Sequence, residues 1–297
     1  MSAPTPMVKP PRRHRWTLAL VIQVAVVLAV PIVFGEVLGW FELNPVQAEF
    51  LSSVGSEAHE LLSSFPDSRL VVEVAYQNSG SLPPPTALNI LEQRINSTCS
   101  KNSVSVQEHP FTSSQSSFTD SDLLSLEASV RQVWPSPGTM SLFYLYLAGS
   151  YAPSNGIIGL AYRGSSIAVF ESTIQSNAAG SEVAAVTTTV MVHEFGHELG
   201  LVGIIGSAPN EDPNHPGHSN DSSDVMYWAV DSTALLLGGL LGGSAPPTQF
   251  DAADLNDLGA VKSAWIPPEL IPVVGTAAAV TAALALAVWG TRRVPKK

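Results

Sequence analysis

The sequence predicts an α/β (α+β) domain, built on a mixed β-sheet and flanked by two transmembrane helices. Two observations lead to this prediction. Between residues 69 and 200, short runs of β-branched and aromatic residues alternate with segments whose apolar residues have helical spacing. Near each end of the chain, a charge-free apolar run (17–35 and 271–290) is long enough to cross a hydrocarbon core of about 30 Å.

Apolar periodicity places the elements of the domain in order. Runs of apolar residues between turn-forming residues indicate strands. Leu88, Leu91 and Ile95 occur at i, i+3 and i+7, which is the spacing of one helix face. The expected strands are residues 69–77, 104–107, 141–148, 157–162 and 166–170, and the expected helices are 86–96, 120–133 capped by Asp120, 182 to about 200 capped by Ser181, and 250–262.

Basic residues predict how the two spans are oriented. Four lysines or arginines precede the first span and four follow the second, so both tails are expected in the cytoplasm and the central domain outside it. A cleaved signal peptide ending near residue 48 is the alternative for the first span. The expected parts are a basic tail (1–15), a transmembrane helix (16–40), a membrane-proximal helix and linker (41–67), the main domain (68–265), a second transmembrane helix (266–290) and a basic tail (291–297).

The composition of the central region excludes some partners. Residues 41–265 hold 6 basic and 23 acidic residues, so this region cannot neutralise the phosphates of a nucleic acid. Cys99 is the single cysteine, which excludes an intrachain disulfide and a cysteine metal site. Nothing in the sequence predicts an oligomeric state.

The sequence 193–200, HEFGHELG, carries the strongest chemical signal. In an H-E-x-x-H helix the two histidines, here His193 and His197, share a face and can bind one metal ion together. Glu194 then lies beside the open coordination position, where it can take a proton from a metal-activated water. Four of the 7 histidines fall within residues 193–218. This arrangement predicts a zinc peptidase.

A catalytic zinc needs a third protein ligand. The simplest arrangement would place it at position 203, which is Gly203 in this chain. The next candidates lie in the polar loop 209–218, and His218 is the first choice. His215 is the alternative third ligand, and Asp212 is a weaker one. A later glutamate is disfavoured, because none occurs between residues 211 and 269.

These residues resemble the archaemetzincins, which carry H-E-x-x-H-x-x-G-x-x-H followed by two cysteines and a methionine. The chain is similar to that pattern with an insertion of about fifteen residues before His218, and Met226 resembles the methionine of the Met-turn. Ser219 and Asp224 stand at the two cysteine positions, so the resemblance implies one catalytic zinc ion and no second, structural zinc. The resemblance covers residues 68–265, and its specific part is 193–227.

The resemblance implies a metzincin-like mixed sheet with an active-site helix and a C-terminal helix. An edge strand just before the zinc helix is expected to border the cleft and pair with an extended substrate. Glu194 is expected to be the general base, and Tyr227 is either an oxyanion donor or a core aromatic under the Met-turn. Glu198 is expected beside the site or on the surface.

The sequence thus predicts a membrane-anchored zinc endopeptidase that acts on proteins or peptides outside the cytoplasm. One alternative is a catalytically inactive binding module with a vestigial zinc site. An intramembrane protease is disfavoured, because no second ligand motif lies in another span. Cys99 as a ligand that keeps the enzyme latent has no support in the residues around it.

Overall fold

The computed structural model describes residues 52–264, except 79, 81, 155, 179, 206–207 and 232–245. By its internal contacts the chain divides into two units, and every described residue belongs to the unit Leu43–Trp265. None of the helices within the described ranges is both long and apolar enough to cross a bilayer. The predicted spans, 16–40 and 266–290, lie outside these ranges, so the membrane organisation and its boundaries stay predictions.

A five-stranded mixed sheet forms the centre of the described domain. Its strands are in the order β2-β1-β4-β7-β6, and all neighbours are parallel except β6, which is antiparallel to β7. The predicted fold class is therefore confirmed for this part of the chain. The bounds of the strands are Arg69–Gln77 (β1), Ser103–Phe111 (β2), Thr139–Leu147 (β4), Gly159–Arg163 (β6) and Ser166–Phe170 (β7).

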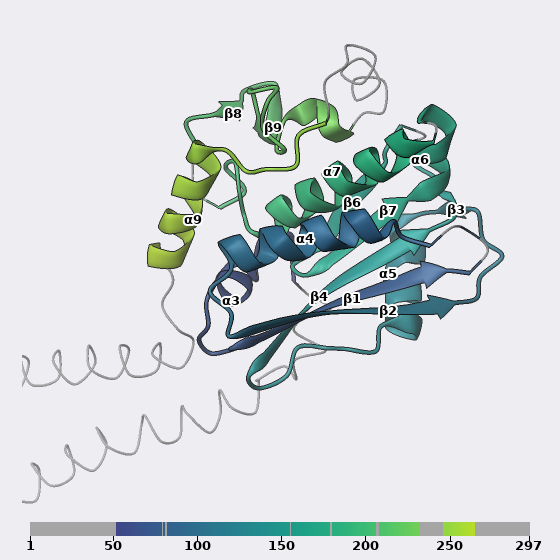
Figure 1. Ribbon diagram of the computed structural model, residues 1–297, viewed down its shortest axis with the longest axis horizontal. Helices are drawn as coiled ribbons and strands as arrows, with labels where there is room; N and C mark the ends of the chain where they lie inside the picture. The colour runs from purple at the N-terminus through teal and green to yellow at the C-terminus, as the bar shows by residue number, and fades with distance from the viewer. Residues whose placement is uncertain are drawn as a thin grey trace, which may run out of the picture. The chain divides into compact units, whose positions relative to one another are not determined.

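Helices cover both faces of the sheet (Figure 1). Helices α4 (Pro85–Thr98) and α7 (Ser181–Glu198) lie on one face, and α5 (Asp120–Val130) lies on the other. The central strand β4 explains this layering, because successive side chains of a strand point to opposite faces. Leu142, Tyr144 and Tyr146 join the core under α4 and α7, whereas Phe143, Leu145 and Leu147 join the core that includes Leu123 of α5.

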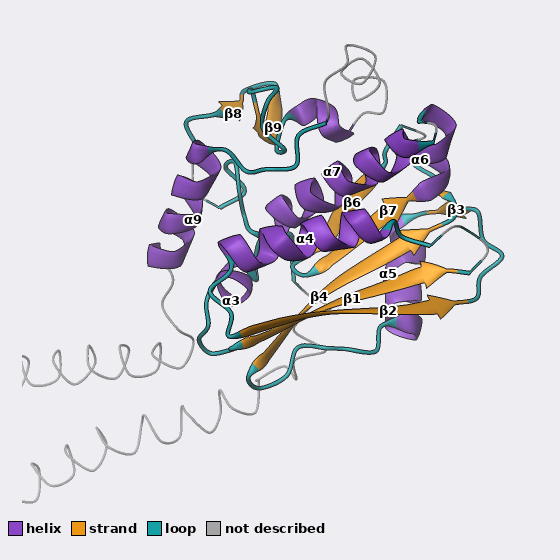
Figure 2. Ribbon diagram, in the orientation of Figure 1, coloured by secondary structure: helices purple, strands orange, loops and turns teal. Residues whose placement is uncertain are grey.

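Among the remaining elements, β8, β9 and α9 lie together at one end of the domain (Figure 2). Helix α9 follows the hairpin that β8 and β9 form, and η1 lies between them in the chain. The bounds are Ala58–Leu62 (α3), Ser117–Phe118 (β3), Ser150–Tyr151 (β5), Glu171–Asn177 (α6), Glu211–Asp212 (β8), His215–Ser219 (β9), Trp228–Asp231 (η1) and Ala252–Ala264 (α9).

The strands and helices predicted between residues 69 and 262 all occur, but two predicted caps are wrong. Thr119, not Asp120, caps α5, because its hydroxyl accepts from the backbone N–H of Asp122 and the Asp122 carboxylate accepts from the backbone N–H of Thr119. This reciprocal pair is a capping box. Ser181 is the first residue of α7, and Gly180 precedes it with a positive φ of 59°.

The predicted edge strand is also wrong, as is the loop predicted for residues 209–218. Strand β7 lies inside the sheet between β4 and β6, and α6 separates it from α7. The edge strand is β6, one strand earlier, because its antiparallel return places it outside β7. Residues in the predicted loop form the β8–β9 hairpin instead.

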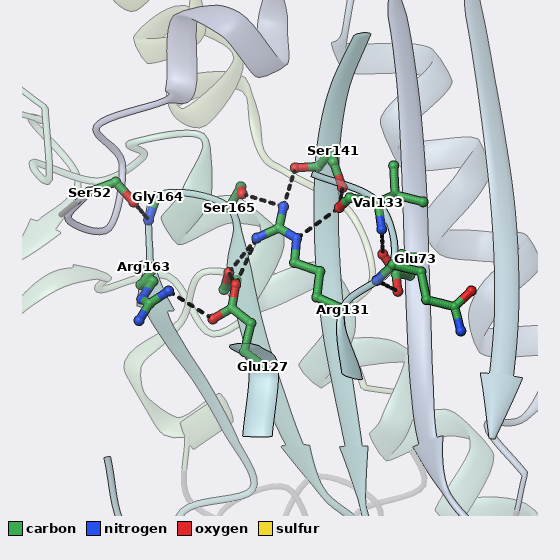
Figure 3. Close-up of polar contacts among 11 residues, drawn as sticks. Ser52, Glu73, Glu127, Arg131, Val133, Ser141, Arg163, Gly164 and Ser165 are labelled. Atoms are coloured by element: carbon green, nitrogen blue, oxygen red, sulfur yellow. Dashed lines mark hydrogen bonds and ion pairs between the residues drawn. The ribbon is translucent and has the colours of Figure 1, made fainter. Parts of the chain in front are cut away.

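A buried ion cluster joins α5 to the sheet (Figure 3). Arg131 bonds Glu127 at 2.7 Å, and Arg163 of β6 lies 3.3 Å from the second oxygen of Glu127. The guanidinium of Arg131 also donates to the Ser141 carbonyl and to the Ser165 hydroxyl. Arg131 and Glu127 are almost completely inaccessible to solvent. Because these groups are shielded from water, the negative charge of Glu127 is compensated by the two arginines, and the arginines by Glu127.

Replacing Arg131 by Met should destabilise the fold by about 3–5 kcal/mol, because it leaves the Glu127 carboxylate buried with half of its compensation. Urea denaturation followed by circular dichroism measures this change. Arg69→Met is the matched control, since Arg69 is exposed at the start of β1 and its loss should change stability by less than about 0.5 kcal/mol. Equal effects of the two substitutions would contradict a structural role for the cluster.

Candidate metal centre

Helix α7 supplies two of the candidate ligands and the candidate base. Its side chains up to Val192 are mostly small, β-branched or apolar, and they pack it against the sheet and α4. His193 is fully buried, Glu194 is 3% exposed and His197 is 9% exposed. The helix ends at Glu198, and Gly200 follows with φ 73°, a conformation that favours glycine, as the sequence predicted.

The β8–β9 hairpin supplies His218. Gly203, where the simplest pattern would place a ligand, has φ 82°, and a Cβ there would lie within 3 Å of the Glu211 carboxylate. The chain turns away at this point and returns along β9. Glu211 also accepts from the backbone N–H of Gly217, which fixes the strand just before His218.

His193, His197 and His218 come together although the last is 21 residues from the second. One ring nitrogen of each lies within 4.8 Å of the others. The ring centroids are 4.6 Å apart for His193 and His197, 5.2 Å for His193 and His218, and 4.9 Å for His197 and His218. The site is thus a compact group of three imidazoles.

Backbone carbonyls orient two of the rings. Nδ1 of His193 donates to the carbonyl of Val225 at 2.7 Å, and Nδ1 of His218 donates to the carbonyl of Pro216 at 3.2 Å. Each bond fixes the tautomer in which Nε2 carries the lone pair, the form that binds a metal ion. The Nε2 atoms of His193 and His197 lie 3.0 Å apart.

This arrangement fits a zinc ion. Two imidazole lone pairs that face each other at 3.0 Å in a buried site repel unless a proton or a cation lies between them. Nitrogens bound to a tetrahedral zinc at 2.0–2.1 Å are about 3.4 Å apart, which is close to the separation here. Three neutral nitrogen ligands are also a donor set that zinc prefers in catalytic sites.

The alternative ligands lie elsewhere. The ring of His215 stacks on Trp228 with centroids 4.1 Å apart, and its Nδ1 lies 3.1 Å from the Asp212 carboxylate. Asp212 also accepts from the backbone N–H of Asn214, and this bond, followed by that of His215, lowers the pKa of Asp212. These residues bond one another and do not belong to the group around His193.

Glu194 lies against the edge strand β6. Its Oε2 accepts from the backbone N–H of Ala161 at 2.8 Å. A Cβ at Gly159 would lie 2.5 Å from Oε1, so only glycine there leaves room for the carboxylate. The glycine at 159 is compatible in sequence with a close approach or an ordinary turn, but its contact with Glu194 and the role of Ala161 were not predicted, because a run of strand residues does not reveal what crosses its edge.

The other predicted residues lie near α7. Met226 is fully buried, and its Sδ would be 2.2 Å from a Cβ at Gly196, so the loop containing Met226 packs directly under the H-E-x-x-H turn. Tyr227 is half-buried, with its ring 5.4 Å from that of Trp228. Glu198 is fully buried, so the expectation that it might lie on the surface is wrong.

Cys99 lies at the C-terminal end of α4 and is not part of the histidine group. Burial raises the pKa of its thiol to about 11, with a smaller opposing effect of the Thr98 hydroxyl. The thiol is therefore protonated at neutral pH and is a poor metal ligand in this position.

A second group of side chains escaped the sequence analysis altogether. Asp224, Asp251 and Asp254 offer carboxylate oxygens that lie within 4.8 Å of one another. A hint was present in the sequence, since Asp251 and Asp254 are spaced D-x-x-D at the start of a predicted helix. That spacing is also ordinary for a helix N-terminus, so it indicated no site by itself.

Comparison with known proteins places the chain beside two solved structures. No protein-family profile matches the sequence, and no curated protein sequence matches it. The structure is similar to that of archaemetzincin from Methanopyrus kandleri, at 15% identity and a TM-score of 0.45 over 65% of this chain and 95% of the other. It is also similar to metalloproteinase-II from Bacteroides fragilis, at 14% identity and a TM-score of 0.39 over 67% and 55%. A functional assignment therefore depends on the geometry of the site itself.

The contact between Met226 and α7 can be tested with two glycines. Gly196→Ala should lower stability by about 1–3 kcal/mol, because the new methyl group overlaps the buried Met226 side chain. Gly259→Ala, in α9 with open space around its Cβ position, should instead raise stability by up to about 1 kcal/mol through helix propensity. The melting temperatures of both variants measure these changes. A Gly196→Ala variant that melts at a higher temperature than the parent would contradict the close packing of Met226 on Gly196.

Proposed function

We propose that this protein is a zinc-dependent endopeptidase. In this proposal His193, His197 and His218 bind one catalytic zinc ion, and Glu194 is the general base. The observation that carries it is the convergence of three imidazole nitrogens within 4.8 Å, together with a carboxylate, that of Glu194 next to His193 in the chain, bonded to a sheet edge. A purely structural zinc site has no need of a base in that position.

Zinc, when bound, would act as a Lewis acid that acidifies water and polarises a peptide carbonyl. The residues of the chain supply the rest. Glu194 accepts the proton of the attacking water and passes it to the amine that leaves. The bond from Ala161 N–H to Oε2 holds the Glu194 carboxylate against the edge strand β6, next to the histidines. Burial of Glu194 at 3% exposure keeps bulk water from competing for the proton.

Strand β6 is the element proposed to bind the substrate. It is the outer strand of the described sheet on the side next to α7, and an extended peptide can add to such an edge. Because Ala161 of this strand bonds Glu194, a peptide aligned along β6 would pass close to the base. Tyr227, half-buried just after Met226, stays a candidate oxyanion donor.

Three substitutions test the proposal in the full chain purified in detergent. Glu194→Gln should keep one zinc per chain but lower peptide cleavage by about 10²–10⁴, because the base is lost and the ligands remain. His218→Ala should lose the zinc. His215→Ala should keep both zinc and activity, since His215 bonds Asp212 and Trp228 instead. Zinc is measured by atomic absorption, and cleavage on casein and a peptide library.

Two results would overturn the assignment. Retention of zinc in His218→Ala would move the third ligand to another residue. Zinc binding with no cleavage by the parent chain on any peptide would leave the binding module with a vestigial site as the function.

We further propose that residues 16–40 and 266–290 anchor the chain in a membrane, with both termini in the cytoplasm and the catalytic domain outside. The charge-free runs and the basic residues beyond them support this arrangement. The full chain should remain in the pellet when membranes are extracted with alkaline carbonate. External protease added to intact cells should cleave the central domain but not the tails, and the reverse pattern would contradict the orientation.

A further inference from the structure

Three carboxyl groups that the proposed peptidase site does not use form a second cluster. Asp224 lies two residues before Met226, Asp251 lies just before α9, and Asp254 lies in its first turn. One oxygen from each lies within 4.8 Å of the others. We propose that Asp224, Asp251 and Asp254 bind a calcium ion, in a site separate from the histidines and independent of the proposed peptidase activity.

Two buried oxygens in this cluster point to a ligand. Asp224 and Asp254 are both 0% exposed. The Oδ1 of Asp224 accepts from the backbone N–H of Met226 at 3.0 Å, and the Oδ1 of Asp254 accepts from the Asn210 amide at 3.2 Å. The Oδ2 of each is buried with no donor in normal hydrogen-bond geometry among the described residues, although the two carboxyl groups interact with each other, and burial raises the pKa of Asp224 against a smaller opposing effect of the Ser219 hydroxyl. Buried carboxylate oxygens without donors are strongly unfavourable unless a cation or a proton neutralises them.

No basic side chain supplies that charge. Within the described ranges, none of the ion pairs between side chains includes Asp224, Asp251 or Asp254. Asn210, which already contacts Asp254, is neutral, and its own Oδ1 is likewise buried without a donor. The surroundings therefore add oxygens and no positive charge.

Helix capping accounts for only one of the three aspartates. The Oδ1 of Asp251 accepts from the backbone N–H of Asp254 at 2.8 Å, which makes Asp251 the N-cap of α9. Its side chain is half-buried, as is common for a cap. Capping does not explain why Asp254 is completely buried, or why Asp224 of another segment meets it there.

The donor set selects calcium among the common metals. Carboxylate and amide oxygens are hard ligands, which calcium and magnesium prefer, whereas zinc in structural sites prefers sulfur and nitrogen. Calcium accepts irregular sets of oxygens, including water, whereas magnesium demands a near-ideal octahedron. Three aspartates from two segments, supplemented by water, fit the more permissive ion.

A calcium ion here would join α9 to the loop that contains Met226. The segment after Asp224 carries the Val225 carbonyl, which bonds His193, and Met226, which packs on Gly196. Its backbone already bonds the chain before α9, through Val225 N–H and the Gln249 carbonyl. The ion would thus add a second link between these two segments, beside the hydrogen bond from Val225 to Gln249.

Protons compete with the cation for the same oxygens. Burial, followed by the neighbouring charge of Asp224, raises the pKa of Asp254 to about 8. Since the folded pKa is above the ordinary 3.8, Asp254 favours the folded state at low pH, and this contribution is lost as the pH rises toward 8. Asp224 and Asp251 are the charged groups that face it, so calcium should raise the melting temperature more at pH 8 than at pH 5.

The test titrates calcium chloride into the full chain after removal of metals by chelation. Calorimetry should show one calcium ion per chain. Asp251→Asn and Asp254→Asn should each weaken binding at least about tenfold, because calcium affinity follows the number of charged ligands. Asn is as good an N-cap as Asp, so Asp251→Asn should fold normally. Glu108→Gln, at an exposed position of β2, is the control for the loss of one negative charge and should leave binding unchanged.

The parent and His218→Ala should bind calcium with equal affinity. The result of this test therefore does not depend on whether the histidines bind zinc. Three outcomes would overturn the calcium site. They are no binding by the parent, unchanged binding in both cluster variants, and equal weakening in Glu108→Gln. If the parent chain binds no calcium, and if Asp254→Asn removes the fall in stability between pH 5 and pH 8, the aspartates share a proton instead of binding a cation.

Discussion

The packing of residues 224–227 beneath α7 is the constraint on which the rest of the site depends. Met226 reaches the helix at Gly196, inside the H-E-x-x-H turn, where no larger residue leaves room. The same approach brings the Val225 carbonyl to Nδ1 of His193. At the end of the preceding strand β9, Ser219 N–H donates to the Met226 carbonyl at 2.7 Å, which places His218 beside the helix. One short segment therefore orients one candidate ligand and positions another.

The same segment joins the two polar clusters of the domain. Val225 and Met226 face the histidines, whereas Asp224 faces the aspartates at the start of α9. Because residues in a folded chain that are adjacent in sequence cannot move independently over more than a few ångströms, the geometry of one cluster limits that of the other. A cation bound by the aspartates would act on the histidines through this backbone and through Asn210, which bonds both Asp254 and the backbone N–H of Asn220 just after β9.

On the opposite side of α7, the sheet edge sets the position of Glu194. The antiparallel return of β6 places Ala161 where its N–H bonds the carboxylate, and Gly159 makes the space. Arg163 at the end of the same strand belongs to the buried ion cluster with Glu127 and Arg131 (Figure 3). Strand β6 is thus held at one end by buried charges and meets the candidate base near the other.

The sequence by itself determined the local elements and half of the site. Periodicity located β1 and β7 residue for residue, and the spacing of His193 and His197 required a shared helix face, since both depend on neighbours close in the chain. Only the tertiary structure decided that β6 is the edge, that β9 brings His218 to the histidines while His215 stacks on Trp228, and that three aspartates meet. These contacts join residues far apart in sequence, and their formation depends on how the whole chain packs, which no local pattern records.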